Sequence, residues 1–469
     1  SGAGWRTLSY GEARAQVHAL AAGMLSRGLD GPIMILSGNS IDHALLALAT
    51  QYVGLVSVPV AEQYSLIPAA HGRLKYIADL VKPALVYAAD GDAYAAALKL
   101  LDCPATCSDV GSSGAIPFDV LQQGRADVRA AHLSVGPDTI AKLLLTSGST
   151  SDPKAVETTQ RMMTTNQAQL RDVFPFLEAR PPVMVDWLPW NHVFGGSLTF
   201  NLVLSNGGAM YIDDGKPLPA LFPRTVENLG LVSATVSFNV PVGFAQLVQA
   251  LEESDALCQS YFKDLDMIFY AGASLPQDTW TRLERVALKT GGRMPVITSG
   301  WGLTETAPGA LVQHEPAKGA GIIGAPLPGV VTKLLDDGTG RMETRVKGPS
   351  IFERYYGNAE KTADAFDQEG FFKTGDAMRF VDPEDVDRGL QFDGRTSEDF
   401  NLSTVTWVHA AQFRIPDCAR SQGTGGTDGC RCTVKRCGAG HPRACARHLV
   451  GHDGICASRC ACPCSGRSA

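Results

Sequence analysis

Residues 143–154 read Leu143-Leu144-Leu145-Thr146-Ser147-Gly148-Ser149-Thr150-Ser151-Asp152-Pro153-Lys154. The apolar run predicts a buried strand, which leads into a loop rich in hydroxyl groups that ends on a lysine. Small residues let backbone N–H groups turn inward around an anion, the hydroxyl groups donate further hydrogen bonds, and the lysine adds a positive charge. The loop therefore predicts a polyphosphate site, although the Walker spacing Gly-x-x-x-x-Gly-Lys-Ser/Thr is absent. Taken alone, it also fits a flexible surface turn rich in Ser and Thr.

Short apolar strands alternate with amphipathic helices on both sides of this loop. Upstream of it we expect helices over 9–28 and 41–53 and strands over 32–36, 55–60 and 84–87. The first helix has a capping box, because Ser9 is followed three residues later by Glu12. Such alternation predicts an α/β fold with mainly parallel sheets covered by helices on both faces. The rhythm returns after residue 155, so we expect two α/β subdomains.

The sequence pattern changes after the second α/β region. Residues 324–380 contain short strands with Gly and Asp turns, which predict a smaller β-rich, mostly antiparallel subdomain. We place a hinge at Asp393-Gly394-Arg395, just after the last well-patterned strand. We therefore expect a large core over 1–394, a hinge with the start of a small domain over 395–408, and a separate tail over 409–469.

Composition excludes several classes of protein for most of the chain. Of 469 residues, 45% are hydrophobic and 19% are charged, values that fit neither a disordered nor a collagen-like chain. No apolar run approaches the roughly 18 residues of a membrane span. The net charge of −7 argues against an electrostatic nucleic-acid binder. Only Cys103, Cys107 and Cys258 precede residue 409, the sparse use expected of a reduced, cytoplasmic enzyme.

The tail has a different composition. Residues 409–469 hold nine of the twelve cysteines, and eight Arg and one Lys stand against three Asp. Apolar spacing disappears there, so we expect no packed core and a disordered segment. A zinc or disulfide module built on Cys430 and the cysteines after it is one interpretation, but most of its spacings are not Cys-x₂₋₄-Cys and nine thiols cannot all pair. The hypothesis that we favour is a reading-frame error that replaced the natural C-terminus, which resequencing of the gene would test.

Six segments in order resemble the motifs of the adenylate-forming superfamily, which includes acyl-CoA synthetases, luciferases and peptide-synthetase adenylation domains. Residues 143–154 are similar to its phosphate loop, Thr-Ser-Gly-Ser/Thr-Thr-Gly-x-Pro-Lys. The other segments are the aromatic, His-containing acid-site segment at 186–195, the adenine-side turn at 270–276, the Tyr-Gly-x-Thr-Glu motif at 299–305 with Trp301 for tyrosine, Thr-Gly-Asp at 374–376, and the hinge pair Gly394-Arg395. Within the superfamily, residues 270–276, 398–402 and 406–408 most resemble feruloyl-CoA synthases.

The resemblance implies a binding site for ATP, Mg²⁺, coenzyme A and a carboxylic acid. The residues that would grip the β- and γ-phosphates are Thr146, Ser147, Gly148, Ser149, Thr150 and Lys154. Those that would border the adenine are Gly272, Ala273, Ser274, Trp301 as a stacking ring, and Gly302. Thr304 would contact the α-phosphate, Glu305 would hold Mg²⁺, Asp376 and Arg395 would bind the ribose, and His192 would lie near the acid. Each residue type also has an ordinary structural use, as a core ring, a loop histidine, a turn aspartate or a solvated charge.

Four departures from the family pattern bear on activity. Ser151 replaces the second loop glycine, which would cost on the order of 1 kcal/mol if the position needs a positive φ. The chain opens at Ser1 inside the family's first domain, so we expect an upstream segment. Asn401 stands where lysine is common, and after Val408 nothing resembles the small C-terminal domain with its lysine. We therefore expect that domain to be truncated or replaced.

The sequence thus predicts an acid:CoA ligase that forms an acyl-adenylate and then a thioester, with a feruloyl- or hydroxycinnamoyl-type acid as substrate and with impaired activity in this chain. A ligase for aliphatic acids, a non-catalytic nucleotide- or acyl-binding protein, and an adenylation domain that serves a carrier protein stay open as alternatives. We expect small-molecule partners, no nucleic acid and no membrane span. Oligomeric state is not predicted.

Overall fold

The computed structural model describes residues 4–146, 152–291, 294–317, 319–336 and 341–396, together with four short strands further along the chain. Its first unit is built on a seven-stranded sheet in the order β5-β4-β3-β1-β2-β6-β7. The strands are β1 (Ile33–Ile35), β2 (Ser57–Pro59), β3 (Leu85–Asp90), β4 (Ala105–Asp109), β5 (Ile116–Pro117), β6 (Ile140–Thr146) and β7 (Lys154–Thr159). Neighbours are parallel except for β6 and β7, which are antiparallel.

Helices cover both faces of this first sheet. They are α1 (Tyr10–Ser26), α2 (Ile41–Tyr52), α3 (Glu62–Leu66), the 3₁₀ turn η1 (Pro68–Ala70), α4 (His71–Val81), α5 (Ala95–Leu101), α6 (Phe118–Leu121) and α7 (Arg129–Ser134). Alternate residues of β1 enter different cores, Ile33 and Ile35 on one face and Met34 on the other. This double burial confirms the predicted parallel architecture.

The predicted cap of the first helix is present. The Glu12 backbone N–H donates to Ser9 Oγ at 3.2 Å, and the Ser9 backbone N–H donates to Glu12 Oε2 at 2.8 Å. The two upstream helices and three upstream strands that we expected are confirmed as α1, α2, β1, β2 and β3. Local pattern and capping therefore suffice to define this unit.

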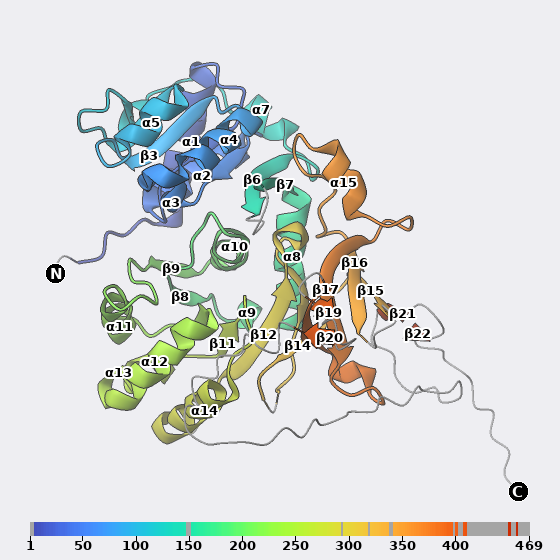
Figure 1. The fold of residues 1–469 in the computed structure, drawn as a ribbon. Helices are drawn as coiled ribbons and strands as arrows, with labels where there is room; N and C mark the ends of the chain where they lie inside the picture. The colour runs from blue at the N-terminus through green and yellow to red at the C-terminus, as the bar shows by residue number, and fades with distance from the viewer. Residues whose placement is uncertain are drawn as a thin grey trace, which may run out of the picture.

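A second α/β unit follows residue 155, as expected. Its parallel strands are β8 (Val183–Asp186) with β9 (Ala209–Ile212), and β10 (Val236–Asn239), β11 (Met267–Tyr270) and β12 (Val296–Gly302). Its helices are α8 (Gln160–Val173), α9 (Phe176–Ala179), the π-helix η2 (Phe194–Thr199), α10 (Phe200–Ser205), α11 (Phe222–Leu231), α12 (Pro241–Glu253), α13 (Asp255–Phe262) and α14 (Gln277–Gly291). Figure 1 shows α11 to α14 grouped at the end of the molecule opposite α1 to α5.

Antiparallel strands extend the second sheet beyond β12. They are β13 (Gly309–Val312), β14 (Ile322–Pro326), β15 (Val331–Asp336), β16 (Met342–Lys347), β17 (Phe372–Phe380) and β18 (Leu390–Arg395), with the short helices η3 (Thr304–Thr306), α15 (Ala359–Ala365) and η4 (Val386–Arg388) between them. The antiparallel character that we predicted for 324–380 is confirmed, and these strands are hydrogen-bonded into one sheet with β10 to β12.

The position of the predicted hinge needs a correction. Asp393, Gly394 and Arg395 lie within β18 and do not follow it, because Arg395 pairs with Asp376 of β17 in the ladder. Beyond residue 396 the structure gives four strands, β19 (Asp399–Asn401), β20 (Trp407–His409), β21 (Leu449–Gly451) and β22 (Cys456–Ala457). Apart from β20, β21 and β22, residues 402–469 lie outside the described residues, so our expectations for the tail, including the cysteine module, stay predictions.

The two units meet where η3 lies against β6 and β7. This short turn begins directly after β12 and its neighbouring residue Leu303, so the end of the second parallel sheet is placed at the edge of the first. Within the described part of the chain, no helix is long and apolar enough to span a membrane.

Candidate active site

The β6–β7 pair brings both ends of the predicted phosphate loop together. Thr146, at the end of β6, lies opposite Lys154, at the start of β7. The Thr146 hydroxyl donates to the Lys154 carbonyl oxygen at 3.4 Å. Ser147, Gly148, Ser149 and Thr150 lie outside the described residues, as does Ser151, so their contacts with phosphate stay predictions.

The hydroxyl of Tyr355 connects Lys154 and Glu305 at this edge of the first sheet. Lys154 Nζ lies 4.0 Å from Glu305 Oε1. Between them, Lys154 Nζ donates to Tyr355 Oη at 2.8 Å, and Tyr355 Oη donates to Glu305 Oε1 at 2.8 Å. Glu305 and Tyr355 are both buried, and Nζ also lies 4.0 Å from the centre of the Tyr355 ring. The structure therefore brings together two charged residues that we predicted from separate motifs 151 residues apart.

Burial governs the ionisation of this group. Desolvation lowers the pKa of Lys154, an effect that the nearby Glu305 carboxylate opposes. Burial and then the Glu305 charge raise the pKa of the Tyr355 phenol well above its usual value. The phenol therefore keeps its proton and donates it toward the carboxylate, while its oxygen accepts from the ammonium group.

Asp376 of β17 is contacted by one hydrogen-bond donor from β12 and by one ion-pair partner from β18. Trp301 Nε1 donates to Asp376 Oδ2 at 2.8 Å, and Arg395 Nε lies 2.9 Å from Asp376 Oδ1. Asp376 and Trp301 are buried, whereas the Arg395 side chain is about half exposed. Because Trp301 precedes Glu305 by four residues, the predicted ribose and metal carboxylates are tied to one chain segment. Stacking of Trp301 on adenine stays a prediction, to which the structure adds the indole bond.

The predicted nucleotide-binding residues described so far come from five strands and a turn. A family model for AMP-binding enzymes matches residues 2–356. The chain belongs to the AMP-binding enzyme family. This family comprises adenylate-forming, AMP-forming acid–thiol ligases, and the fold and family predictions are confirmed at that level.

Relatives of this AMP-binding enzyme include ligases for different acids. A long-chain-fatty-acid–CoA ligase of Mycobacterium bovis is 26% identical over 437 residues, which cover 84% of this chain and 70% of the relative. The malonate–CoA ligase of Arabidopsis thaliana is 29% identical over 258 residues, 52% of this chain and 41% of the relative. The crystal structure of ATP-bound MatB from Rhodopseudomonas palustris has a TM-score of 0.68 and 24% identity, covering 84% of this chain and 75% of that one. The likeness to MatB shows the fold, whereas the family rests on the model that matches residues 2–356, and none of the three names an aromatic acid.

The residues of this AMP-binding enzyme that we predicted to border the adenine form an exposed turn. Gly272, Ala273 and Ser274 follow β11, and Gly272 has a φ of +86°, a conformation that favours glycine. Gly302 ends β12, where an added Cβ would lie 1.7 Å from the Pro308 carbonyl oxygen. Thr304 opens η3 next to Glu305. The segments therefore lie at the carboxyl ends of neighbouring parallel strands, where α/β sheets bind ligands.

The predicted acid-site histidine lies in a loop held by its own backbone. His192 is exposed, and its Nδ1 accepts a hydrogen bond from the Phe194 N–H at 3.3 Å. The Gly196 N–H donates to the His192 carbonyl oxygen at 2.8 Å. The neutral ring therefore carries its proton on Nε2. The contact of His192 with the acid stays a prediction.

A buried aspartate, which the sequence alone did not identify, fixes this loop. Asp186 ends β8, and its Oδ1 accepts from the Leu188 N–H at 3.0 Å while the Thr199 hydroxyl lies 2.5 Å from Oδ2. Burial raises the pKa of Asp186 to about 7. The residue thus connects the end of β8 with both the loop and the last turn of η2.

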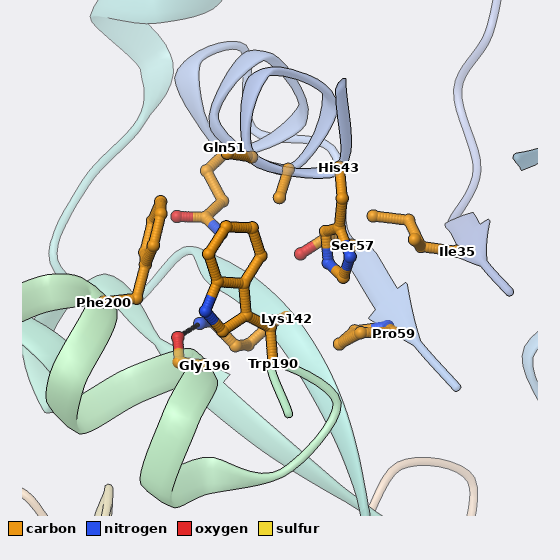
Figure 2. Close-up of a pocket in the computed structure, with 11 residues that line it drawn as sticks. Ile35, His43, Gln51, Ser57, Pro59, Lys142, Trp190, Gly196 and Phe200 are labelled. Atoms are coloured by element: carbon orange, nitrogen blue, oxygen red, sulfur yellow. Dashed lines mark hydrogen bonds between the residues drawn. The ribbon is translucent and has the colours of Figure 1, made fainter. Parts of the chain in front are cut away.

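A second unpredicted residue, Lys142, joins the strand of the phosphate loop to η2. Its Nζ donates to the Gly196 carbonyl oxygen at 2.7 Å, and burial lowers its pKa to about 8. Figure 2 shows Lys142 beside a cavity of about 20 Å³ that Trp190 and His43 also line. The signal for Lys142 was a charged residue inside an apolar strand run, whereas Tyr355 and Asp186 carried no comparable local signal.

Proposed function

We propose that the chain activates a carboxylic acid with ATP, forming an acyl-adenylate and pyrophosphate, and then transfers the acyl group to coenzyme A. The observation that carries this proposal is the convergence of Lys154 and Glu305 at 4.0 Å, with Asp376 tied to the same segment through Trp301. An ammonium group beside a carboxylate suits a phosphate chain that carries its own cation, because each charge has a ligand of opposite sign.

In the proposed first step, the acid's carboxylate attacks the α-phosphorus of ATP and the bond to pyrophosphate breaks. Lys154, with Thr146 and the loop residues, would hold the β- and γ-phosphates, and Thr304 would contact the α-phosphate. Asp376 and Arg395 would orient the ribose. Such catalysis consists mainly of positioning and electrostatic stabilisation of the charge that builds on the transferring group.

The residues present fit Mg²⁺ at Glu305. Magnesium is usually held by one or two carboxylates together with substrate phosphates, and not by a cage of protein ligands. Among the described residues no group of three or more His, Cys, Asp or Glu side chains gathers, so Glu305 with phosphate oxygens is the arrangement that this site offers. When bound, the ion would neutralise charge on the phosphates.

For the acid we propose a single carboxylate on an aromatic, hydroxycinnamoyl-type skeleton. Residues 187–196, 237–244 and 300–307, where we expect the acid to lie, contain no Lys or Arg. A dicarboxylic acid would therefore find no permanent cation for its second carboxylate in these segments. The rings of Trp187, Phe194 and Phe238 support an aromatic acid, because they belong to one apolar cluster at this side of the site.

Acid-dependent exchange of labelled pyrophosphate into ATP tests both the proposed reaction and the proposed class of acid. The panel contains ferulic acid, a long-chain fatty acid and malonic acid, with coenzyme A thioester formation measured separately. We expect slow exchange that is fastest with ferulic acid, and still slower thioester formation. A preference for the fatty acid would overturn the aromatic assignment only. ATP binding without exchange for any acid would select a non-catalytic nucleotide-binding protein.

A further inference from the structure

We propose that Tyr355 is a positioning residue for the magnesium–nucleotide complex, because its hydroxyl bridges Lys154 and Glu305, whose charged atoms form only a long ion pair of 4.0 Å. The inference rests on the proposed function, since it concerns how the same site receives MgATP. Tyr355 belongs to none of the motifs from which the site was predicted.

The backbone around Tyr355 is attached to both charged residues. Tyr355 forms an antiparallel bridge with Val156 of β7, and the Tyr356 N–H donates to the Ala155 carbonyl oxygen at 2.8 Å. On the other side, the Phe352 N–H donates to the Glu305 carbonyl oxygen at 2.8 Å. The segment 352–356 therefore connects the strand that begins at Lys154 with the turn that contains Glu305.

Packing then fixes the ring. The Tyr355 side chain is buried, and its ring centre lies 4.7 Å from that of Phe352 in a tilted arrangement. The Tyr355 N–H also donates to Thr362 Oγ1 at 3.0 Å. With backbone and ring both held, the hydroxyl has one position, 2.8 Å from Lys154 Nζ and 2.8 Å from Glu305 Oε1.

This arrangement leaves both charges able to bind a ligand. A lysine ammonium group has three protons, and Tyr355 uses one of them. Tyr355 occupies Glu305 Oε1, while none of the described residues donates a hydrogen bond to Oε2. A short salt bridge would turn each charge fully toward the other, whereas here the two charged atoms lie 4.0 Å apart. The intervening phenol satisfies one position on each and keeps the remaining donors and acceptors for phosphate and metal.

A purely structural network would predict something different. In that case removal of the hydroxyl would lower stability and weaken every form of nucleotide equally. If Tyr355 positions Glu305 for a metal, its removal should weaken MgATP binding selectively, because binding of ATP without Mg²⁺ does not use the carboxylate. The effect of Mg²⁺ on ATP affinity is therefore the quantity that separates the two roles.

The test is calorimetric titration of the full chain and of Tyr355→Phe with ATP, in the presence of Mg²⁺ and in the presence of EDTA. Phe keeps the ring under Lys154 and removes only the hydroxyl. Tyr356→Phe is the matched control, since it removes a neighbouring phenol that makes no hydrogen bond to the site residues. We expect Tyr355→Phe to lose about tenfold in MgATP affinity, the size expected for a hydrogen bond to a charged group, and to lose clearly less in EDTA, where only the position of Lys154 bears on ATP binding.

The results distinguish a failure of the proposed function from a failure of the role proposed for Tyr355. Wild-type chain that binds no MgATP would defeat the proposed function and this inference with it. Wild-type binding with equal MgATP affinity in Tyr355→Phe and Tyr356→Phe would defeat only the role of Tyr355, as would equal losses with Mg²⁺ and with EDTA. Glu305→Gln adds a coupling test, because the Mg²⁺ effect that it removes should not be lost a second time in the double variant.

A second modification guards against a Tyr355→Phe protein that does not fold. Incorporation of 3-fluorotyrosine at position 355 keeps the ring and hydroxyl and makes the phenol a stronger donor to Glu305. We expect the Mg²⁺ enhancement of ATP affinity to fall by about twofold, because the carboxylate shares more of its charge with the phenol. An unchanged enhancement in a folded protein would overturn the proposal.

Discussion

The side chain of Asp376 is held in position by protein contacts alone, without a ligand. Its Oδ2 accepts from the buried Trp301 indole at 2.8 Å, and its Oδ1 lies 2.9 Å from Arg395 Nε. The indole hydrogen bond and the guanidinium charge partly replace the water that this buried carboxylate has lost. The indole N–H of Trp301 therefore contributes more than an aromatic surface.

The Trp301→Phe variant separates the predicted stacking on adenine from the hydrogen bond to Asp376. The phenyl ring can still stack on a base, but it leaves a buried carboxylate with one donor fewer, so we expect the free energy of unfolding to fall by about 1–3 kcal/mol beyond the loss of volume. Trp280→Phe is the matched control, because Trp280 is equally buried and its Nε1 has no hydrogen-bond partner among the described residues. Urea unfolding measures both variants. Equal losses would show that the Trp301–Asp376 bond adds nothing.

For single residues, the sequence analysis identified the charged residues of the site better than the side chains that contact them. Lys154, Glu305 and Asp376 were predicted because each belongs to a motif with its own spacing. Tyr355 was missed because its partners lie 201 and 50 residues away along the chain, and only folding places them together. Trp301 was assigned to the right segment, but a bond from its N–H to a residue 75 positions away leaves no trace in local sequence.

Among the elements, the π-helix η2 depends on small residues. Added Cβ atoms at Gly195 and Gly196 would lie 2.4 Å from the Leu188 carbonyl oxygen and 2.1 Å from the Trp190 carbonyl oxygen. The glycines thus allow η2 to pack directly on the loop that contains His192. π-Helical turns are uncommon and often occur at functional sites.

Gly196→Ala should therefore destabilise the protein by about 2 kcal/mol or more, because backbone atoms must move to admit the methyl group. Gly230→Ala is the control, since Gly230 is exposed in α11 and an added Cβ would meet nothing within 4 Å. We expect that variant to be as stable as the parent or slightly more stable. Thermal unfolding compares the two, and an unaffected Gly196→Ala protein would contradict the packing described for η2.

Asp186 gives the same region a dependence on pH. Burial raises its pKa to about 7, so the folded state holds the proton more tightly than the unfolded chain. Its stabilising contribution is complete below the unfolded pKa near 4 and is lost as the pH rises through about 7. Thr199 also agrees with a protonated carboxyl, because its hydroxyl lies 3.0 Å from the Gly195 carbonyl oxygen and has only one proton to donate.

We therefore expect wild-type protein to lose about 2 kcal/mol of unfolding free energy relative to Asp186→Asn between pH 5 and pH 8. Asn keeps the shape and removes the titration. Urea unfolding at both pH values measures the difference. A constant difference between the two proteins across this range would mean that Asp186 does not titrate there.

Helices and strands whose sequence pattern lies entirely within the element were predicted well. The capping box of α1 and the two-sided apolar pattern of β1 need no distant information. The end of the last strand was misplaced because β18 is extended to Arg395 by pairing with β17, a long-range effect that a local turn signal at Gly394 cannot show, while the hinge itself stays a prediction. The π-helix was not predicted either, since its form depends on what packs against its glycines.

For the whole molecule, the described site lies within one continuous part of the chain. Lys154, Glu305 and Asp376 contact side chains between residues 154 and 395. The aberrant composition begins only after residue 408. The sequence therefore predicted both the family and the part of the chain that has to be tested for nucleotide binding, whereas the identity of the acid depends on side-chain arrangement that no motif specifies.

Removal of residues 410–469 should leave the affinity for MgATP unchanged to within about twofold, because none of the contacts described for the nucleotide site comes from that segment. Calorimetric titration of the shortened and full chains makes the comparison. A loss of tenfold or more would show that the tail takes part in the site, and would argue against the reading-frame hypothesis.

The central claim is that Lys154, Glu305 and Asp376 bind one nucleotide. Titration of the full chain with MgATP tests it most directly, using Lys154→Met, Glu305→Gln and Asp376→Asn, with Lys289→Met as an exposed-lysine control. We predict one saturable site whose affinity falls by about tenfold or more in each of the three site variants and is unchanged in the control. Absence of binding, or binding that is indifferent to all three substitutions, would contradict the account.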